Sequence, residues 1–281
     1  MLVNMNDVLQ PACAGGYGVG FFNALNIEMA RAIIETAEQL RAPVMIGTAE
    51  ILLPITPLER VAEYLLPMAE KASVPVCVHF DHALRYETCM KAMRLGFTSV
   101  MYDCSTMGNQ ENQEQVAQVV KAAHSMGVTV EGELGHVGDN EGAGKLDDPS
   151  AYFTDPAEAR QFTKATGVDA LAVAVGNAHG EYPFAPKLDF ARIEQLSAAT
   201  GVPLVLHGGS GLSDDDFRKA IARGVRKINI FTDLDKAGAE GCRKAMEQGI
   251  YKMSDMIPVV LNEMKATVNR LICLFGSDGK A

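Results

Sequence analysis

Eight short apolar runs alternate with longer segments along this chain, and that alternation constrains the fold more than any other feature. Most of the runs are continuously apolar, which is typical of parallel strands covered on both faces. The segments between them have helix lengths, and several end at a glycine or shortly before a proline. The predicted strands are 18–23, 43–48, 75–80, 99–103, 129–134, 170–175, 203–208 and 227–232, and the predicted helices include 27–40, 58–72, 111–127 and 214–224.

Eight strands, each followed by a helix, predict an α/β fold of the (β/α)8 TIM barrel type. An open, doubly wound sheet is the competing architecture. The barrel is favoured because polar residues follow many different strands, whereas an open sheet gathers its site at one switch point. No Pro/Gly/Ser-rich linker divides the chain, so we expect one domain over 1–281, with an extra C-terminal helix at about 257–275. The long glycine-rich, acidic segment 134–156 is typical of a lid or binding loop.

Composition argues against several classes of protein. The formal net charge of −10 is unfavourable for binding nucleic acid or an anionic membrane. The N-terminus lacks a basic start followed by an apolar stretch, and no apolar run reaches the roughly 18 residues of a membrane helix. The six cysteines form no CxxC pair, which is typical of reduced thiols. We expect a cytoplasmic protein.

Three histidines follow three of the predicted strands: His82, His179 and His207. In a barrel, the carboxyl ends of all strands meet at one mouth, so the three imidazoles can converge. Three protein nitrogens with one open position are typical of a catalytic zinc site. His79 lies three residues before His82, and in an extended strand it would point to the opposite side. We therefore predict a metal on the first three histidines and place His79 in the core or beneath the site.

Carboxylates accompany these histidines. Asp81 precedes a predicted ligand and is placed to accept a hydroxyl proton beside the metal. Asp103 ends a strand, and we expect it to hydrogen-bond a metal-binding histidine. Glu131 and Glu133 lie two residues apart in one strand, so both can point inward. Glu133, at the strand end, is the better candidate to reach the site. Glu141 lies in the long loop, where it would reach a substrate on closure; a solvated loop carboxylate is an equally weighted alternative.

Glycines and small polar residues follow the last strands. Residues 208–210 follow the seventh strand and 229–232 the eighth, where barrels commonly bind phosphate. With Gly180 they form a predicted anion site. Asn23 and Thr48, at the first two strand ends, are candidates to contact hydroxyl groups. Metal, carboxylate and anion site together predict a metal-assisted reaction on a phosphorylated small molecule.

The segments FDHA, EGELGHVG, VGNAHG, LHGGSG and INIFTDL, in this order and spacing, resemble the class II, metal-dependent ketose-phosphate aldolases. The resemblance covers nearly the whole chain. It implies Zn²⁺ acting as a Lewis acid on the carbonyl of dihydroxyacetone phosphate, and Na⁺ or K⁺ near the phosphate. It implies that Asp81 takes the C4 hydroxyl proton and that Glu141 exchanges the C3 proton. It also implies a homodimer or homotetramer. The implied phosphate and ketone binders are Gly180, Gly208, Gly209, Ser210, Asn229 and Thr232.

Two departures from the family's bisphosphate aldolases bear on substrate choice. Phe231 takes a position where those relatives often have Asp or Ala, and Asp235 replaces an Arg or Lys that grips the distal phosphate. We therefore predict a substrate that is a ketose 1-phosphate without a distal phosphate. Arg270 or a neighbouring subunit could restore the missing charge, and a fructose- or tagatose-1,6-bisphosphate aldolase is the first alternative. A non-catalytic barrel subunit of an aldolase complex and a zinc hydrolase are the others.

Overall fold

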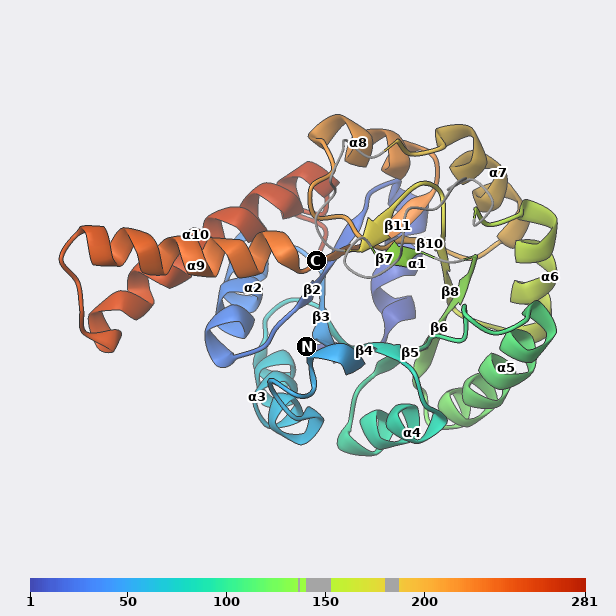
Figure 1. Cartoon of the computed structure of the whole chain (residues 1–281), viewed down its shortest axis with the longest axis horizontal. Coiled ribbons are helices and arrows are strands. Elements are labelled where there is room, and N and C mark those ends of the chain that lie inside the picture. Colours follow the sequence, from blue (N-terminus) through green and yellow to red (C-terminus); the bar gives the residue numbers. More distant parts are fainter. Residues whose placement is uncertain (136, 140–152, 180–186) are drawn as a thin grey trace.

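The computed structural model describes residues 1–135, 137–139, 153–179 and 187–281. Eight parallel strands close into a barrel surrounded by helices, which confirms the predicted TIM barrel (Figure 1). Around the barrel the order is β2, β3, β4, β5, β6, β8, β10, β11 and back to β2. These strands are β2 (Val19–Asn23), β3 (Val44–Ala49), β4 (Val76–Ala83), β5 (Ser99–Tyr102), β6 (Thr129–Leu134), β8 (Ala170–Val173), β10 (Leu204–Leu206) and β11 (Val225–Ile230).

Amphipathic helices cover the outside of the barrel. Helix α2 illustrates why they form: Asn26 caps its first turn by accepting from Met29 N, and Arg41 in the left-handed region ends it. The 3-10 turn η1 (Glu50–Leu52) follows β3. The helices are α2 (Ile27–Leu40), α3 (Leu58–Lys71), α4 (Tyr86–Leu95), α5 (Asn109–Ser125), α6 (Pro156–Thr166), α7 (Phe190–Thr200), α8 (Asp214–Ala222), α9 (Thr232–Glu247) and α10 (Met253–Phe275).

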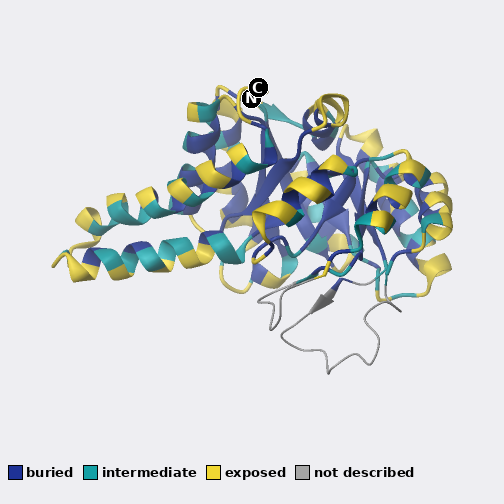
Figure 2. Ribbon diagram, turned by 90° about the horizontal axis from the view of Figure 1, so that it is seen from above, coloured by how far each residue is buried: buried dark blue, intermediate teal, exposed yellow. Residues whose placement is uncertain are grey.

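The expected C-terminal helix is α10, which begins four residues earlier than predicted and packs against α9 and α2. Helices α9 and α10 form a hairpin that projects from the barrel, and this arm is more exposed than the strands at the centre (Figure 2).

The N-terminus adds two elements that the sequence analysis did not predict. Strand β1 (Leu2–Val3) pairs with the start of β4, and helix α1 (Met5–Gly15) follows it. A capping box between Asn4 and Asp7 starts this helix. Met5 N donates to Thr129 Oγ1 at the start of β6, so α1 covers the N-terminal end of the barrel.

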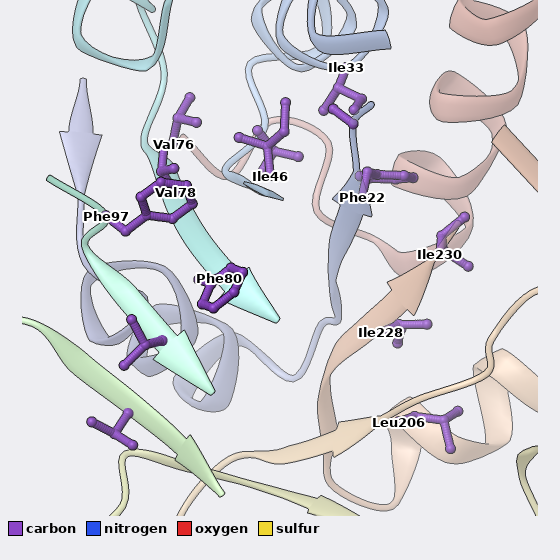
Figure 3. Close-up of a cluster of buried hydrophobic side chains, with 14 of the residues drawn as sticks. Phe22, Ile33, Ile46, Val76, Val78, Phe80, Phe97, Leu206, Ile228 and Ile230 are labelled. Atoms are coloured by element: carbon purple, nitrogen blue, oxygen red, sulfur yellow. The ribbon is translucent and has the colours of Figure 1, made fainter. Parts of the chain in front are cut away.

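The strands contribute to two apolar cores because their side chains alternate. Phe21 and Met45 point into the barrel and pack with Leu9 of α1. Their neighbours Phe22 and Ile46 point outward to the helices, within the large cluster of Figure 3. The barrel interior is therefore apolar at the N-terminal ends of the strands, and the polar residues of the interior lie nearer the carboxyl ends.

A short two-stranded sheet joins two of the loops at that end. Strand β7 (Gly138–Asp139) pairs in parallel with β9 (Ala178–His179).

Among the described residues, none of the helices is both long enough and apolar enough to cross a membrane.

Candidate active site

The end of β4 directs two consecutive side chains toward the same site. Asp81 is buried and faces the barrel interior. In a regular strand His82 would face away, but its φ of 44° lies in the left-handed region, and the pairing of β4 with β5 shifts between Phe80 and Ala83. Such a conformation is strained for a non-glycine residue and is often found at functional sites. The broken alternation places the His82 ring beside Asp81, with Nε2 at 4.0 Å from Asp81 Oδ2.

His82 and His207 meet at the mouth of the barrel. Nε2 of His82 lies 2.7 Å from Nδ1 of His207. The opposite nitrogen of each ring contacts a carboxylate: His82 Nδ1 lies 2.9 Å from Asp103 Oδ2, and His207 Nε2 lies 2.8 Å from Glu131 Oε1. A carboxylate on the outer nitrogen fixes the orientation of an imidazole and leaves the inner nitrogen to a metal. The two inner nitrogens therefore face a common point, as two ligands of one ion would.

A network of buried charges lies directly beneath these rings. Lys227 Nζ is 2.7 Å from Glu131 Oε2 and donates to Asn229 Oδ1 at 2.8 Å. Asn229 Nδ2 lies 3.2 Å from both carboxylate oxygens of Asp81. His79 Nε2 is 3.6 Å from both Asp81 Oδ1 and Glu131 Oε2. His79 thus lies beneath the site, on the same inward side as Asp81, because the strand alternation fails at His82 rather than at His79.

The electrostatics of the two histidines favour a single shared proton when no metal is bound. Burial opposes a charge on His82, but Asp81, Asp103 and Glu133 raise its pKa to about 10. Burial and the nearby His82 lower the pKa of His207 to about 4. Burial also opposes ionisation of Asp81, yet His82 and Lys227 hold its pKa well below its ordinary value. The site therefore contains an ionised carboxylate beside a pair of imidazoles. A metal ion that binds this pair would displace the proton that the two rings hold.

The donor set fits a divalent metal. Among the described residues, three groups of side chains bring their ligand atoms within 4.8 Å of one another: Asp81, His82 and His207; His82, Asp103 and Glu133; and, beneath the rings, His79, Asp81 and Glu131. Burial and the neighbouring Asp103 raise the pKa of Glu133 to about 8. Its Oε1 accepts from Val137 N, whereas the buried Oε2 has no hydrogen-bond partner among the described residues. Such an unpaired buried oxygen is costly unless a cation or water completes it.

Two loops next to the histidines contact each other through their backbones. Gly209 N donates to Asn229 O, and a Cβ on Gly209 would lie 2.8 Å from that oxygen, so glycine permits this close approach. Ser210 Oγ accepts from Asp233 N in the first turn of α9. Gly208 has a φ of 62° and leads the turn. The loops after β10 and β11 therefore join at the N-terminus of a 16-residue helix, which favours an anion.

Other predicted site residues also lie at this end of the barrel. Asn23 and Thr48 are buried, and Asn23 Oδ1 and Thr48 Oγ1 have no hydrogen-bond partner among the described residues. Phe231 immediately precedes Thr232, the first residue of α9. Asp235 lies in the first turn of the same helix and is exposed.

Some of the predictions concern residues that the structure does not describe. Glu141 and Gly180 lie outside the described residues, as does most of the segment 134–156. The backbone of His179 belongs to β9, next to the site, but no contact of its side chain is described. Their roles stay predictions.

The sequence patterns gave too little weight to two buried residues of the site. They favoured Glu133 over Glu131, yet Glu131 contacts His207, while Glu133 lies near His82 and Asp103. They did not indicate Lys227. The signal for both was available: each is a charged residue at an inward-facing position of a strand, two residues before another polar residue of the site.

Comparison with known proteins identifies the family. A family model described as class II fructose-bisphosphate aldolase matches residues 3–280. The chain belongs to this family. It is therefore a lyase of the class II aldolase type, whose members generally depend on zinc.

Relatives named for two different substrates are equally similar to this aldolase. A fructose-bisphosphate aldolase of Geobacillus stearothermophilus is 38% identical over 288 residues, covering 100% of this chain and 99% of the relative. A sulfofructosephosphate aldolase of Alkalicoccus urumqiensis is 38% identical over 281 residues, covering 99% and 98%. The crystal structure of the YdjI aldolase from Escherichia coli K12 has a TM-score of 0.90 at 35% identity, with 100% of both chains covered.

Proposed function

We propose that this aldolase cleaves a ketose 1-phosphate without a distal phosphate, reversibly, into dihydroxyacetone phosphate and an aldehyde. The observation that carries the proposal is the pair of inner imidazole nitrogens of His82 and His207, with the ionised Asp81 beside them. Membership of the aldolase family supports the carbon–carbon bond cleavage.

Each proposed role follows from a side chain's position. His82, His207 and His179 would hold Zn²⁺, which supplies Lewis-acid polarisation of the ketose carbonyl when bound. Asp81 would take the C4 hydroxyl proton during cleavage and return it during condensation. Asp103 and Glu131 keep the two described histidine rings in place. Glu141 is the proposed residue for proton exchange at C3.

The remaining polar groups would bind the substrate. The loop of Gly208, Gly209 and Ser210, with the N-terminus of α9 at Thr232, is the proposed phosphate site, together with Gly180 and a monovalent cation, Na⁺ or K⁺. Asn23 and Thr48 would contact the middle hydroxyls of the sugar, because their buried oxygens have no partner among the described residues.

The substrate's distal end is proposed from Phe231 and Asp235. Because Asp235 is exposed, solvent screens its repulsion of a distal phosphate, and the absence of a cation at that position has the larger effect. The alternative donor Arg270 is paired with Asp214 at 2.8 Å. Phe231 adds an apolar surface beside Thr232. These features favour an uncharged distal end, and fructose or tagatose 1,6-bisphosphate is the alternative.

A distal sulfonate is the third substrate class to test, because one relative is named sulfofructosephosphate aldolase. The experiment compares kcat/KM for ketose 1-phosphates ending in hydroxyl, phosphate or sulfonate, with dihydroxyacetone phosphate as the measured product. We expect the hydroxyl form to be preferred at least tenfold over the bisphosphate. Equal efficiency on both would contradict the proposal. Release of inorganic phosphate instead of triose phosphate would indicate a hydrolase.

Self-association is proposed from the arm of α9 and α10. At its tip, Met246, Tyr251 and Met253 are 54%, 76% and 68% exposed, so three large side chains with apolar surface gather at one end of the arm. We infer a homodimer or homotetramer in which a second copy covers this tip. Light scattering should give a multiple of 30.1 kDa, and Tyr251→Asp together with Met253→Asp should lower it.

The proposed compartment is the cytoplasm. All six cysteines are free thiols, as expected in a reducing environment.

A further inference from the structure

Lys227 is the one lysine or arginine, among the described residues, that is buried without exposed surface. Burial of an ammonium group costs several kcal/mol unless charges and hydrogen bonds compensate it. A buried ion pair is also a weak source of stability, since apolar residues of similar volume often serve as well. The fold alone therefore does not explain a lysine at this inward-facing position.

Lys227 is linked to Asp81, the proposed acid/base residue, through the side chain of Asn229. Its Nζ lies 2.7 Å from Glu131 Oε2, which supplies the compensating charge, and 4.5 Å from the ring centroid of Phe21. The ammonium donates to Asn229 Oδ1 at 2.8 Å. The direct distance from Nζ to Asp81 Oδ1 is longer, at 3.9 Å.

The chemistry of the two groups fixes the orientation of the amide between them. An ammonium can only donate, so it requires the oxygen of Asn229 on its side. The amide nitrogen of Asn229 must then face the opposite way, where it lies 3.2 Å from each oxygen of Asp81. Without the lysine, Asn229 could rotate and present its oxygen to the Asp81 carboxylate, which would repel it.

We propose that Lys227 is a positioning residue for Asp81: it orients the Asn229 amide, which in turn holds the Asp81 carboxylate toward the substrate. The inference depends on the proposed function, because it assigns a catalytic purpose to the position of Asp81. Glu131 balances the charge of Lys227 and separately orients His207.

The test is the double variant Lys227→Met, Glu131→Gln, compared with Glu131→Gln alone. The double substitution removes both buried charges, and the new amide oxygen at position 131 can still accept from His207 Nε2. Relative to Glu131→Gln alone, we expect the double variant to lose about a further 10- to 100-fold in kcat for cleavage, as for other residues that orient a functional group, with KM changed less than about threefold. The single variant keeps Lys227, so its own loss of kcat relative to the parent measures the separate role of Glu131 in orienting His207.

Two further measurements separate positioning from a structural role. Zinc affinity, measured by competition with a chelator, should differ by less than about threefold between the double variant and Glu131→Gln alone, because both lack the carboxylate that orients His207. Solvent hydrogen exchange at C3 of dihydroxyacetone phosphate should also be retained, because that half-reaction does not use Asp81. Lys219→Met, which removes an exposed lysine paired with Asp215 on α8, is the matched control and should change none of these quantities.

Several outcomes would overturn the proposal. Unchanged kcat in the double variant would show that Asp81 needs no help from Lys227. An equal loss in Glu131→Gln alone would assign the effect to Glu131, and a parallel loss of hydrogen exchange would show general damage. If the parent cleaves no ketose 1-phosphate, the proposed function fails. A crystal structure of the double variant then still tests the inference, which requires the Asn229 amide to have turned away from Asp81.

Discussion

The two ends of the barrel interior are built from opposite chemistry. At the N-terminal end, Leu9 of α1 packs on Phe21 and Met45 in an apolar core. At the carboxyl end, Asp81, Glu131 and Lys227 are equally buried but are held by ion pairs and hydrogen bonds. Apolar burial contributes to stability, whereas burial of charges opposes it unless each is paired. The comparison indicates that one end of the barrel maintains the fold and the other is specialised for chemistry.

The largest expected effect comes from the charged end. Asp81→Ala should lower kcat by about 10²- to 10⁴-fold, because the proposed general base is lost. About one zinc per chain should remain bound, as measured by atomic absorption. Asp278→Ala, in the exposed C-terminal tail, is the control and should leave both quantities unchanged. Loss of the metal along with activity would show that the role assigned to Asp81 is wrong.

The apolar end should show the opposite pattern. Leu9→Ala removes a fully buried side chain and should lower the free energy of unfolding by about 2–5 kcal/mol. Zinc affinity should be unaffected, because Leu9 lies at the far end of the barrel. Leu84→Ala, at a 60% exposed position beyond the end of β4, is the control and should change stability by less than about 0.5 kcal/mol. Urea unfolding of both variants measures the difference. A shift in zinc affinity in Leu9→Ala would show that the two ends are coupled.

Metal binding at the charged end should depend on pH. In the metal-free protein, neighbouring carboxylates outweigh the effect of burial and raise the pKa of His82 to about 10, so this ring is protonated at neutral pH. A metal ligand must be neutral, and zinc binding therefore releases a proton. Zinc affinity should rise about tenfold per pH unit between about pH 6 and 9. Calorimetry in buffers of different ionisation enthalpy counts the proton, and an affinity that does not vary with pH would refute this account.

The smallest effect is expected from a polar contact at the N-terminal end. His124 is paired with Asp169 at 2.8 Å, but its side chain is 44% exposed. His124→Gln should change the free energy of unfolding by less than about 1 kcal/mol, because solvent screens such pairs. The urea midpoint measures this change. A loss as large as that of Leu9→Ala would mean that polar contacts stabilise this end as much as apolar packing does.

Much of the fold could be predicted from periodicity, because burial on both faces leaves continuous apolar runs. The predicted strand at 129–134 and the helix at 27–40 match β6 and α2 in full, and the other predicted strands overlap the observed ones closely. The N-terminal helix α1 was missed. This helix lies between a very short strand and the first barrel strand, so the strand–helix alternation does not predict it.

Residue type and strand-end position alone indicated a site containing Asp81, His82, Asp103 and His207, since a barrel brings all its carboxyl ends to one mouth. The tertiary structure decided how they meet. The left-handed backbone at His82 turns two consecutive side chains to the same site, which a period of two cannot predict. It also showed that Glu131, rather than Glu133, contacts His207, and that Lys227 lies between Glu131 and Asn229. These contacts join β4, β6, β10 and β11, and their distances depend on the closure and register of the barrel, which local sequence does not encode.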